Sequence, residues 1–125
     1  RDALLVKVRK DGPACHKGTE SCFNDRVWES DELNEFTLDG LMKLIAGRKT
    51  EKKEGSYTTY LFEKGLDKIL KKVGEEAVET VIAAMKGNAG EVCSEAADLL
   101  YHLLVLMNQQ GVTPQDVYDE LARRR

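Results

Sequence analysis

The sequence has no apolar run of the roughly 20 residues that a membrane-spanning helix needs. Its opening residues also lack the basic segment and apolar core that are typical of a signal peptide. It has three cysteines, an odd number, whereas a disulfide framework pairs an even number. These absences argue against a membrane protein and a disulfide scaffold, and we expect a cytoplasmic protein with reduced thiols.

The sequence also lacks an excess of positive charge. Its formal net charge is -3, whereas nucleic-acid binding generally needs a basic face, so we expect no nucleic-acid partner. What it does have is 125 residues, 42% of them hydrophobic and 33% charged, which is enough for one ordinary domain with its own core. Because the first residue is not methionine and lies in a strand-like pattern, we expect a piece of a longer protein.

Two unlike segments follow one another. In residues 1–24 apolar side chains alternate through Leu4, Val6 and Val8, as in a half-buried strand, and turn residues follow. From about residue 29 the apolar residues recur with helical spacing. We therefore predict a short β and loop segment over 1–28 and a helical domain over 29–125.

The helical domain divides at glycines and caps. The predicted helices run from 38 to near Gly47, through a short segment that ends near Gly65, over 66–85, over 89–108, and from Thr113-Pro114 onward. Short connections between long amphipathic helices predict an all-α, antiparallel helical bundle.

The helix over 66–85 carries a pair of carboxylates. Glu76 and Glu79 are three residues apart, so their like charges are adjacent and repel, and a cation between them would remove that penalty. Lys72 lies one turn below and Glu75 farther round. We place the pair at the edge of a core-facing arc formed by Leu66, Ile69, Leu70, Val73, Ala77, Val81 and Ala84. A solvated acidic face is the alternative for this pair alone.

The helix over 89–108 is apolar nearly all round, so we expect it to be central and largely buried. One polar stripe, formed by Glu91, Glu95, Asp98 and His102, interrupts it. Buried carboxylates are costly unless they are paired or bound to a metal. Two pairs with the same spacing on consecutive helices predict a shared hard cation, Mg²⁺ or Mn²⁺, rather than zinc.

Two further residues of this helix have simpler interpretations. His102 could orient the Asp98 carboxylate, but a structural histidine with satisfied hydrogen bonds is the preferred interpretation. Cys93 is interpreted as a core residue. A helix this apolar is poorly covered by so few neighbours, so we expect a homodimer.

Three motifs carry a family resemblance: Gly55-Ser56-Tyr57-Thr58, the stretch from Lys72 to Glu79, and the stretch from Glu95 to Leu106. They resemble the all-α nucleoside-triphosphate pyrophosphohydrolase superfamily and, within it, the phosphoribosyl-ATP pyrophosphohydrolases, over about residues 36–122. The resemblance implies hydrolysis of phosphoribosyl-ATP to phosphoribosyl-AMP and pyrophosphate, the second step of histidine biosynthesis. It also implies a homodimer.

The resemblance gives these residues roles. Glu76, Glu79, Glu95 and Asp98 would hold Mg²⁺. Glu75, Glu76 and Glu79 are the candidate catalytic carboxylates, with Glu75 or Glu79 accepting the proton of the attacking water. Lys72 would bind phosphate, or alternatively pair with Glu76. Ser56, Tyr57 and Thr58 would bind the nucleotide at a helix start, with ordinary capping as the alternative, and Arg48, Lys49, Lys52 and Lys53 could draw in the polyphosphate.

The first segment resembles a second family. The stretches Asp2 to Val8, Gly12 to Gly18 and Ser21 to Phe23 resemble the end of phosphoribosyl-AMP cyclohydrolase, the enzyme of the next step. This implies that Cys15 and Cys22 are relict zinc ligands and Asp2 a relict magnesium ligand. The set is incomplete, so we expect Zn²⁺ only in an intact cyclohydrolase domain of the parent protein.

Two other functions fit the same motifs. One is a house-cleaning pyrophosphohydrolase that acts on aberrant nucleoside triphosphates. The other is a non-catalytic helical interaction module whose acidic stripe is a structural ion-pair network.

Overall fold

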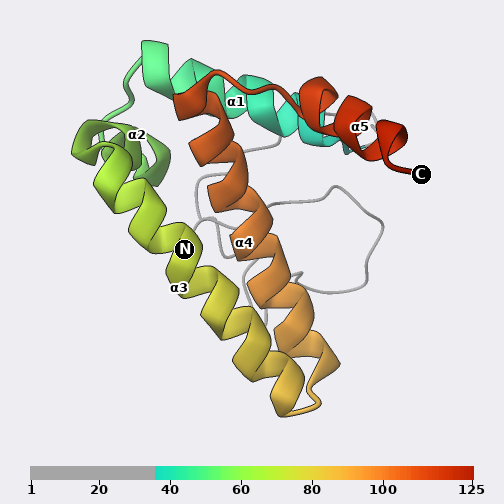
Figure 1. Cartoon of the computed structure of the whole chain (residues 1–125). Helices are drawn as coiled ribbons and strands as arrows, with labels where there is room; N and C mark the ends of the chain where they lie inside the picture. The colour runs from blue at the N-terminus through green and yellow to red at the C-terminus, as the bar shows by residue number, and fades with distance from the viewer. Residues whose placement is uncertain (1–35) are drawn as a thin grey trace.

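Five helices follow one another in the part of the chain described by the computed structural model, residues 36–125, and this part contains no strand (Figure 1). They are α1 (Leu38–Thr50), α2 (Tyr57–Lys64), α3 (Leu66–Met85), α4 (Ala89–Gln110) and α5 (Pro114–Arg123). The predicted all-α class is therefore confirmed. The predicted β segment over 1–28 lies outside the described residues.

Side-chain caps explain most of the helix starts. The Thr37 hydroxyl accepts a hydrogen bond from the Gly40 amide at 2.9 Å, and Thr113 and Asp116 form a capping box at the start of α5. Gly111 ends α4 in the left-handed conformation, with φ 76°. The prediction that the first helix ends near Gly47 is wrong, because α1 continues to Thr50. An interior glycine costs a helix only about 1 kcal/mol, so packing elsewhere can carry the helix past it.

The hairpin of α3 and α4 is the longest part of the fold, and the chain reverses between them at Gly87, whose φ is 71° (Figure 1). At the end away from this turn, α1 packs on α4 and α2 packs on α3. The last helix, α5, packs along α1. The turn end of the hairpin extends beyond the three shorter helices, as Figure 1 shows.

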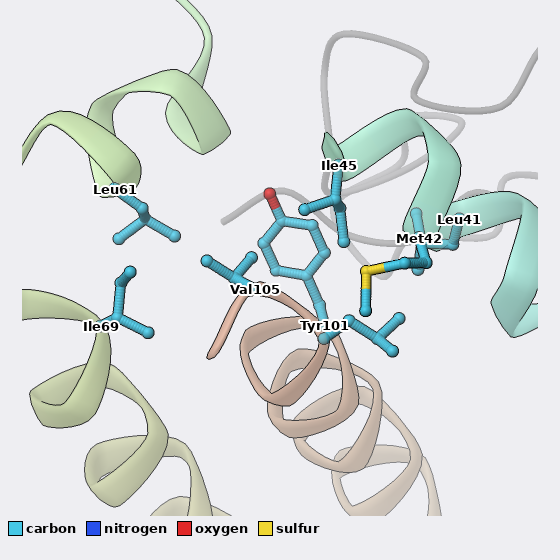
Figure 2. Packing of buried hydrophobic residues seen from close by; sticks show 8 residues of the cluster. Leu41, Met42, Ile45, Leu61, Ile69, Tyr101 and Val105 are labelled. Carbon is cyan, nitrogen blue, oxygen red and sulfur yellow. The ribbon is translucent and has the colours of Figure 1, made fainter. Parts of the chain in front are cut away.

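The apolar core lies at the end where four helices meet (Figure 2). Its buried members come from α1, α2, α3 and α4: Leu41, Met42, Ile45, Leu61, Ile69, Tyr101, Leu104 and Val105. Burying each large aliphatic side chain contributes about 1.5–3 kcal/mol. This core fixes the base of the hairpin and so the relative position of α3 and α4.

The face that α3 turns to the core differs from the predicted arc. Leu66, Leu70 and Val81 are 37%, 47% and 58% exposed, so their predicted core positions are wrong. Ala84 is exposed as well, whereas Ile69 is buried as predicted. The buried residues of α3 are Ile69, Glu76 and Ala83, seven residues apart along one stripe. Apolar residues occupy more than one side of α3, and within the described residues only the sides toward α4 and α2 are covered.

The uncovered side of α3 forms an apolar row near the hairpin turn. Val78, Val81, Ile82 and Met85 are all exposed, Met85 to 82%. Two expectations for α4 also fail, because Leu100 is 46% exposed and Cys93 is exposed rather than in the core. None of the helices within residues 36–125 is long and apolar enough to cross a membrane.

Candidate metal centre

Carboxylates from both arms of the hairpin converge. One carboxylate oxygen each from Glu76 and Glu79 on α3 and from Glu95 on α4 lie within 4.8 Å of one another. Glu76 is buried, Glu95 half-buried and Glu79 exposed, so this three-carboxylate cluster opens to solvent on the side of Glu79. The antiparallel crossing of α3 and α4 thus brings together residues that are 16 to 19 positions apart in the sequence.

Asp98, the fourth predicted ligand, lies beside this cluster. It is 4% exposed, and its charge acts on both Glu76 and Glu95. Its carboxylate is outside the set of three that lie within 4.8 Å. Asp98 is one turn from Glu95 on α4, so it extends the acidic site along that helix.

The electrostatics of the cluster are unfavourable without a cation. Burial raises the pKa of Glu95 to about 7, and contact with Glu79 and the charges of Asp98 and Glu76 act in the same direction. Burial also raises the pKa of Glu76, as do the charges of Asp98 and Glu79, against the opposing charge of Lys72. The folded chain therefore holds several carboxylates where ionisation is penalised.

Two of the carboxylate oxygens are also left without a partner. Glu76 Oε1 and Glu95 Oε1 are buried and accept no hydrogen bond. Such groups are costly, and a bound hard cation would satisfy both. The cluster contains only oxygen donors, which suits Mg²⁺ or Mn²⁺, whereas zinc prefers cysteine and histidine. The residues present therefore fit the predicted ion.

Lys72 neutralises the outer edge of the site. Its Nζ atom is 3.4 Å from Glu76 Oε2 and 3.4 Å from Glu75 Oε1. Burial alone would lower the pKa of Lys72, but the charges and hydrogen bonds of Glu76 and Glu75 raise it overall, so the lysine stays charged. The predicted pairing of Lys72 with Glu76 is thus present. Glu75 is on the outer side of this pair, with a side chain that is 45% exposed.

The hydroxyls at the start of α2 already have partners within the chain. Ser56 caps the helix by accepting a hydrogen bond from the Thr59 amide at 3.2 Å. The Tyr57 hydroxyl is 2.9 Å from His102 Nε2, and the Thr58 hydroxyl is hydrogen-bonded to the Tyr101 hydroxyl. The capping alternative is therefore present for Ser56, and nucleotide binding by these three residues stays a prediction.

His102 is a buried structural histidine, which confirms the interpretation preferred from the sequence. Its Nδ1 atom is 2.7 Å from the backbone carbonyl of Asp98, so the ring contacts the main chain of Asp98 rather than its carboxylate. Burial lowers the pKa of His102 to about 4, which keeps the ring neutral at pH 7. No local sequence pattern indicates the bond to Tyr57, which is 45 residues away.

The predicted basic residues line two surface hollows next to α2. One, of about 200 Å³, is bordered by Arg48, Lys49 and Lys52 together with Phe62. The other, of about 610 Å³, includes Lys52, Lys53 and Ser56. Neither hollow is lined by a carboxylate of the three-carboxylate cluster. The predicted relict ligands Asp2, Cys15 and Cys22 lie outside the described residues.

Comparisons with known proteins identify relatives of the chain. Residues 38–125 match the family described as phosphoribosyl-ATP pyrophosphohydrolase. Proteins from Caldanaerobacter subterraneus subsp. tengcongensis and Bacillus subtilis are each 52% identical, over 98% and 99% of this chain and 60% of their own length. One from Shewanella oneidensis is 46% identical over 98% of this chain and 56% of its own length.

All three relatives are named histidine biosynthesis bifunctional protein HisIE. The chain thus spans a little under two thirds of the length of these relatives, and the family match covers the whole helical hairpin with its carboxylates. Because this match extends over residues 38–125, which include the paired carboxylates of α3 and α4, the chain belongs to the phosphoribosyl-ATP pyrophosphohydrolase family.

Proposed function

We propose that this domain hydrolyses phosphoribosyl-ATP to phosphoribosyl-AMP and pyrophosphate, with Mg²⁺ bound at the three-carboxylate cluster and Asp98. The observation that carries the proposal is the convergence of Glu76, Glu79 and Glu95 with two buried, unpartnered oxygens, in a chain of this family. Mn²⁺ would fit the same oxygen donors.

Each residue near the cluster has a distinct task in this reaction. When bound, the cation would supply charge neutralisation on the phosphates and Lewis-acid activation. Glu79 is exposed at the open side of the cluster and offers one carboxylate oxygen to it, so its other oxygen can accept the proton of the attacking water. Glu75 is the less favoured base, because it is paired with Lys72 and lies outside the cluster.

The positive charge that would attract the substrate comes from several lysines and from Arg48. Lys72 is held charged beside Glu76 and can bind a phosphate oxygen as a point charge. Lys52, Lys53 and Ser56 border one hollow, where the polyphosphate or the phosphoribosyl group would be attracted.

The direct test is pyrophosphate release from phosphoribosyl-ATP by the purified chain at saturating Mg²⁺, with ordinary nucleoside triphosphates assayed in parallel. We expect turnover of phosphoribosyl-ATP that stops when EDTA is added and returns with Mg²⁺. Turnover of ordinary triphosphates alone would identify a house-cleaning enzyme instead. Absence of any metal-dependent hydrolysis would favour the non-catalytic interaction module.

The functional unit in this proposal is a homodimer. The apolar row Val78, Val81, Ile82 and Met85 follows the same helix as Glu76 and Glu79 and is exposed within the described chain. A second copy packed on this row would remove apolar surface from water and cover the carboxylate half of the hairpin. The row has helical spacing, as expected for helix-to-helix packing.

Sedimentation at several protein concentrations tests the dimer. Val81→Glu should shift the wild-type dimer to a monomer, because a charge would be buried at the centre of the apolar row. Leu121→Glu is the matched control, since Leu121 is 60% exposed but lies on α5. A wild-type monomer at all concentrations, or dimers for both variants, would rule out this interface.

The parent protein would also carry phosphoribosyl-AMP cyclohydrolase activity, with residues 1–28 as the end of that domain and Zn²⁺ bound only when the domain is intact. Support comes from the relatives, which are named bifunctional and align over 98–99% of the chain, beyond the family match that begins at residue 38. A cytoplasmic location and the absence of a nucleic-acid partner stay predictions.

A further inference from the structure

Two side chains join the start of α2 to the turn of α4 that carries Asp98. The Tyr57 hydroxyl is 2.9 Å from His102 Nε2, and His102 Nδ1 is 2.7 Å from the Asp98 carbonyl oxygen. The rings of Tyr57 and His102 also meet edge to face, with centroids 5.7 Å apart and planes at 81°. His102 is 3% exposed, so this connection is sheltered from water.

The partners fix the direction of both hydrogen bonds. A backbone carbonyl can only accept, so His102 Nδ1 carries the hydrogen and donates to Asp98. In the neutral ring Nε2 is then an acceptor, and the Tyr57 hydroxyl donates to it. The His102 ring is therefore held from both sides in one tautomer and one orientation.

The geometry points to a positioning role for this pair. Tyr57 is the first residue of α2, directly after the Ser56 cap, and Asp98 is the carboxylate beside the three-carboxylate cluster. We propose that Tyr57 and His102 hold the Asp98 turn at the distance that metal binding requires and couple it to the start of α2. This inference rests on the metal site of the proposed function. Residues that bond a ligand tune metal binding without touching the metal, and here the bond reaches the main chain of the Asp98 turn.

A second connection between the same helices provides the control. The Thr58 and Tyr101 hydroxyls are hydrogen-bonded, and both residues are buried. This bond also ties α2 to α4, but it ends on a core side chain rather than on the Asp98 carbonyl. Tyr101→Phe therefore removes a buried bond between α2 and α4 and leaves the path to Asp98 intact.

The experiment compares Tyr57→Phe with Tyr101→Phe in the full chain. Mn²⁺ binding without substrate is measured by electron paramagnetic resonance of the free ion, and kcat and KM are measured with Mg²⁺. For Tyr57→Phe we expect about a 10-fold loss in Mn²⁺ affinity or in kcat, the low end of the range for partners that bond a ligand directly, because this path ends on the main chain of Asp98. KM for the nucleotide reports separately on the predicted nucleotide binding by Tyr57. Tyr101→Phe should lower the melting temperature yet keep wild-type Mn²⁺ affinity.

A third variant separates the two bonds. His102→Asn retains an N–H donor near the Nδ1 position but is too short to reach Tyr57. Because both residues act along one path, Tyr57→Phe combined with His102→Asn should lose no more Mn²⁺ affinity than His102→Asn alone. Circular dichroism verifies that each variant is helical, and Tyr57→Phe by itself decides the matter if His102→Asn fails to fold.

Three outcomes overturn the inference: wild-type Mn²⁺ affinity and kcat in Tyr57→Phe, equal losses in Tyr57→Phe and Tyr101→Phe, or additive losses in the double variant. Each of these presupposes a wild-type chain that binds Mn²⁺ and hydrolyses the nucleotide. A wild-type chain without metal binding would instead refute the proposed function, so the two failures are distinguishable.

Discussion

The two halves of the α3–α4 hairpin differ in what surrounds them. At the base, α1 and α2 pack on the hairpin, and the facing residues, such as Ile69, Leu104 and Val105, are 3% exposed or less. Toward the turn, the facing residues include the carboxylates Glu76, Glu79 and Glu95, while the outer side of α3 presents Val81 to solvent. One pair of helices thus contains both an ordinary core and an acidic interface.

Stability and the proposed function are separated along the hairpin. The base of the hairpin is stabilised by apolar burial within the described chain and needs no ligand. The carboxylate half contains repelling charges and unpartnered buried oxygens, which favour binding of a cation. A site of this kind is costly to the fold, and the base supplies the rigidity that keeps its two helices in place.

The largest expected effect is on turnover in the carboxylate half. Glu95→Gln and Asp98→Asn each remove a charge next to the proposed cation and should lower kcat by about 100-fold or more, as loss of a preorganised electrostatic group does. Both variants keep the side-chain shape, so the helical circular dichroism spectrum should be unchanged. Near wild-type kcat in both variants would refute the metal-site model.

A substitution at the base of the hairpin should instead lower the stability and leave kcat unchanged. Leu61→Ala removes a fully buried side chain from the core and should lower the free energy of unfolding by about 2–5 kcal/mol. The chain that remains folded should keep its kcat, since Leu61 is not part of the cluster. Urea unfolding followed by circular dichroism, with activity assayed well below the midpoint, measures both quantities. A loss of kcat as large as that of Glu95→Gln would mean that the two halves are not separable.

A smaller effect concerns pH and metal removal. In the folded chain the pKa of Glu95 is raised from 4.5 to about 7, so between these values the folded state binds the proton more tightly than the unfolded state. In EDTA, the stability that the protonated Glu95 carboxyl contributes is fully present below pH 4.5 and is lost as the pH rises to about 7. Mg²⁺ binds the ionised carboxylates, so its stabilising effect should grow over the same range.

Melting temperatures from pH 5 to pH 8, with EDTA or with Mg²⁺, measure this dependence. Glu95→Gln cannot ionise at this position and should show a weaker decline in EDTA and a smaller gain from Mg²⁺. If the wild-type chain in EDTA gained stability with rising pH relative to Glu95→Gln, the direction of the pKa shift would be wrong.

The sequence predicted what depends on neighbouring residues. The caps at Thr37 and Thr113 and the left-handed Gly111 act within one turn, and the helices predicted from residue 38 and from Thr113-Pro114 begin at these caps. The meeting of Glu76 and Glu79 with Glu95 was also predictable, because a short connection makes the hairpin antiparallel.

The buried side of α3 and the bond between Tyr57 and His102 depend on tertiary packing. Helical spacing allowed more than one buried side for α3, and the arc containing Leu70 was as regular as the stripe that includes Glu76 and is actually buried. The bond between Tyr57 and His102 joins residues 45 positions apart and leaves no local pattern. The sequence therefore indicated which residues meet across the turn but not which contacts hold Asp98 in place.

The smallest expected effect is at Glu91, which shares the acidic stripe of α4 with Glu95 and Asp98. Its carboxylate is 3.5 Å from Lys86 Nζ, and both side chains are about half exposed or more, at 47% and 60%. An exposed pair of this kind contributes roughly 0–1 kcal/mol, so Glu91→Gln should change the free energy of unfolding by no more than that.

Because Glu91 lies outside the three-carboxylate cluster, Glu91→Gln should also leave kcat and Mn²⁺ affinity at wild-type values. The substitution is the same as in Glu95→Gln, four residues away on one helix, so a difference between the two variants measures position rather than charge. If Glu91→Gln weakened Mn²⁺ binding as much as Glu95→Gln, the cation would be held by the general negative field of α4. The part of α4 that acts in metal binding would then extend past Glu95 toward the hairpin turn.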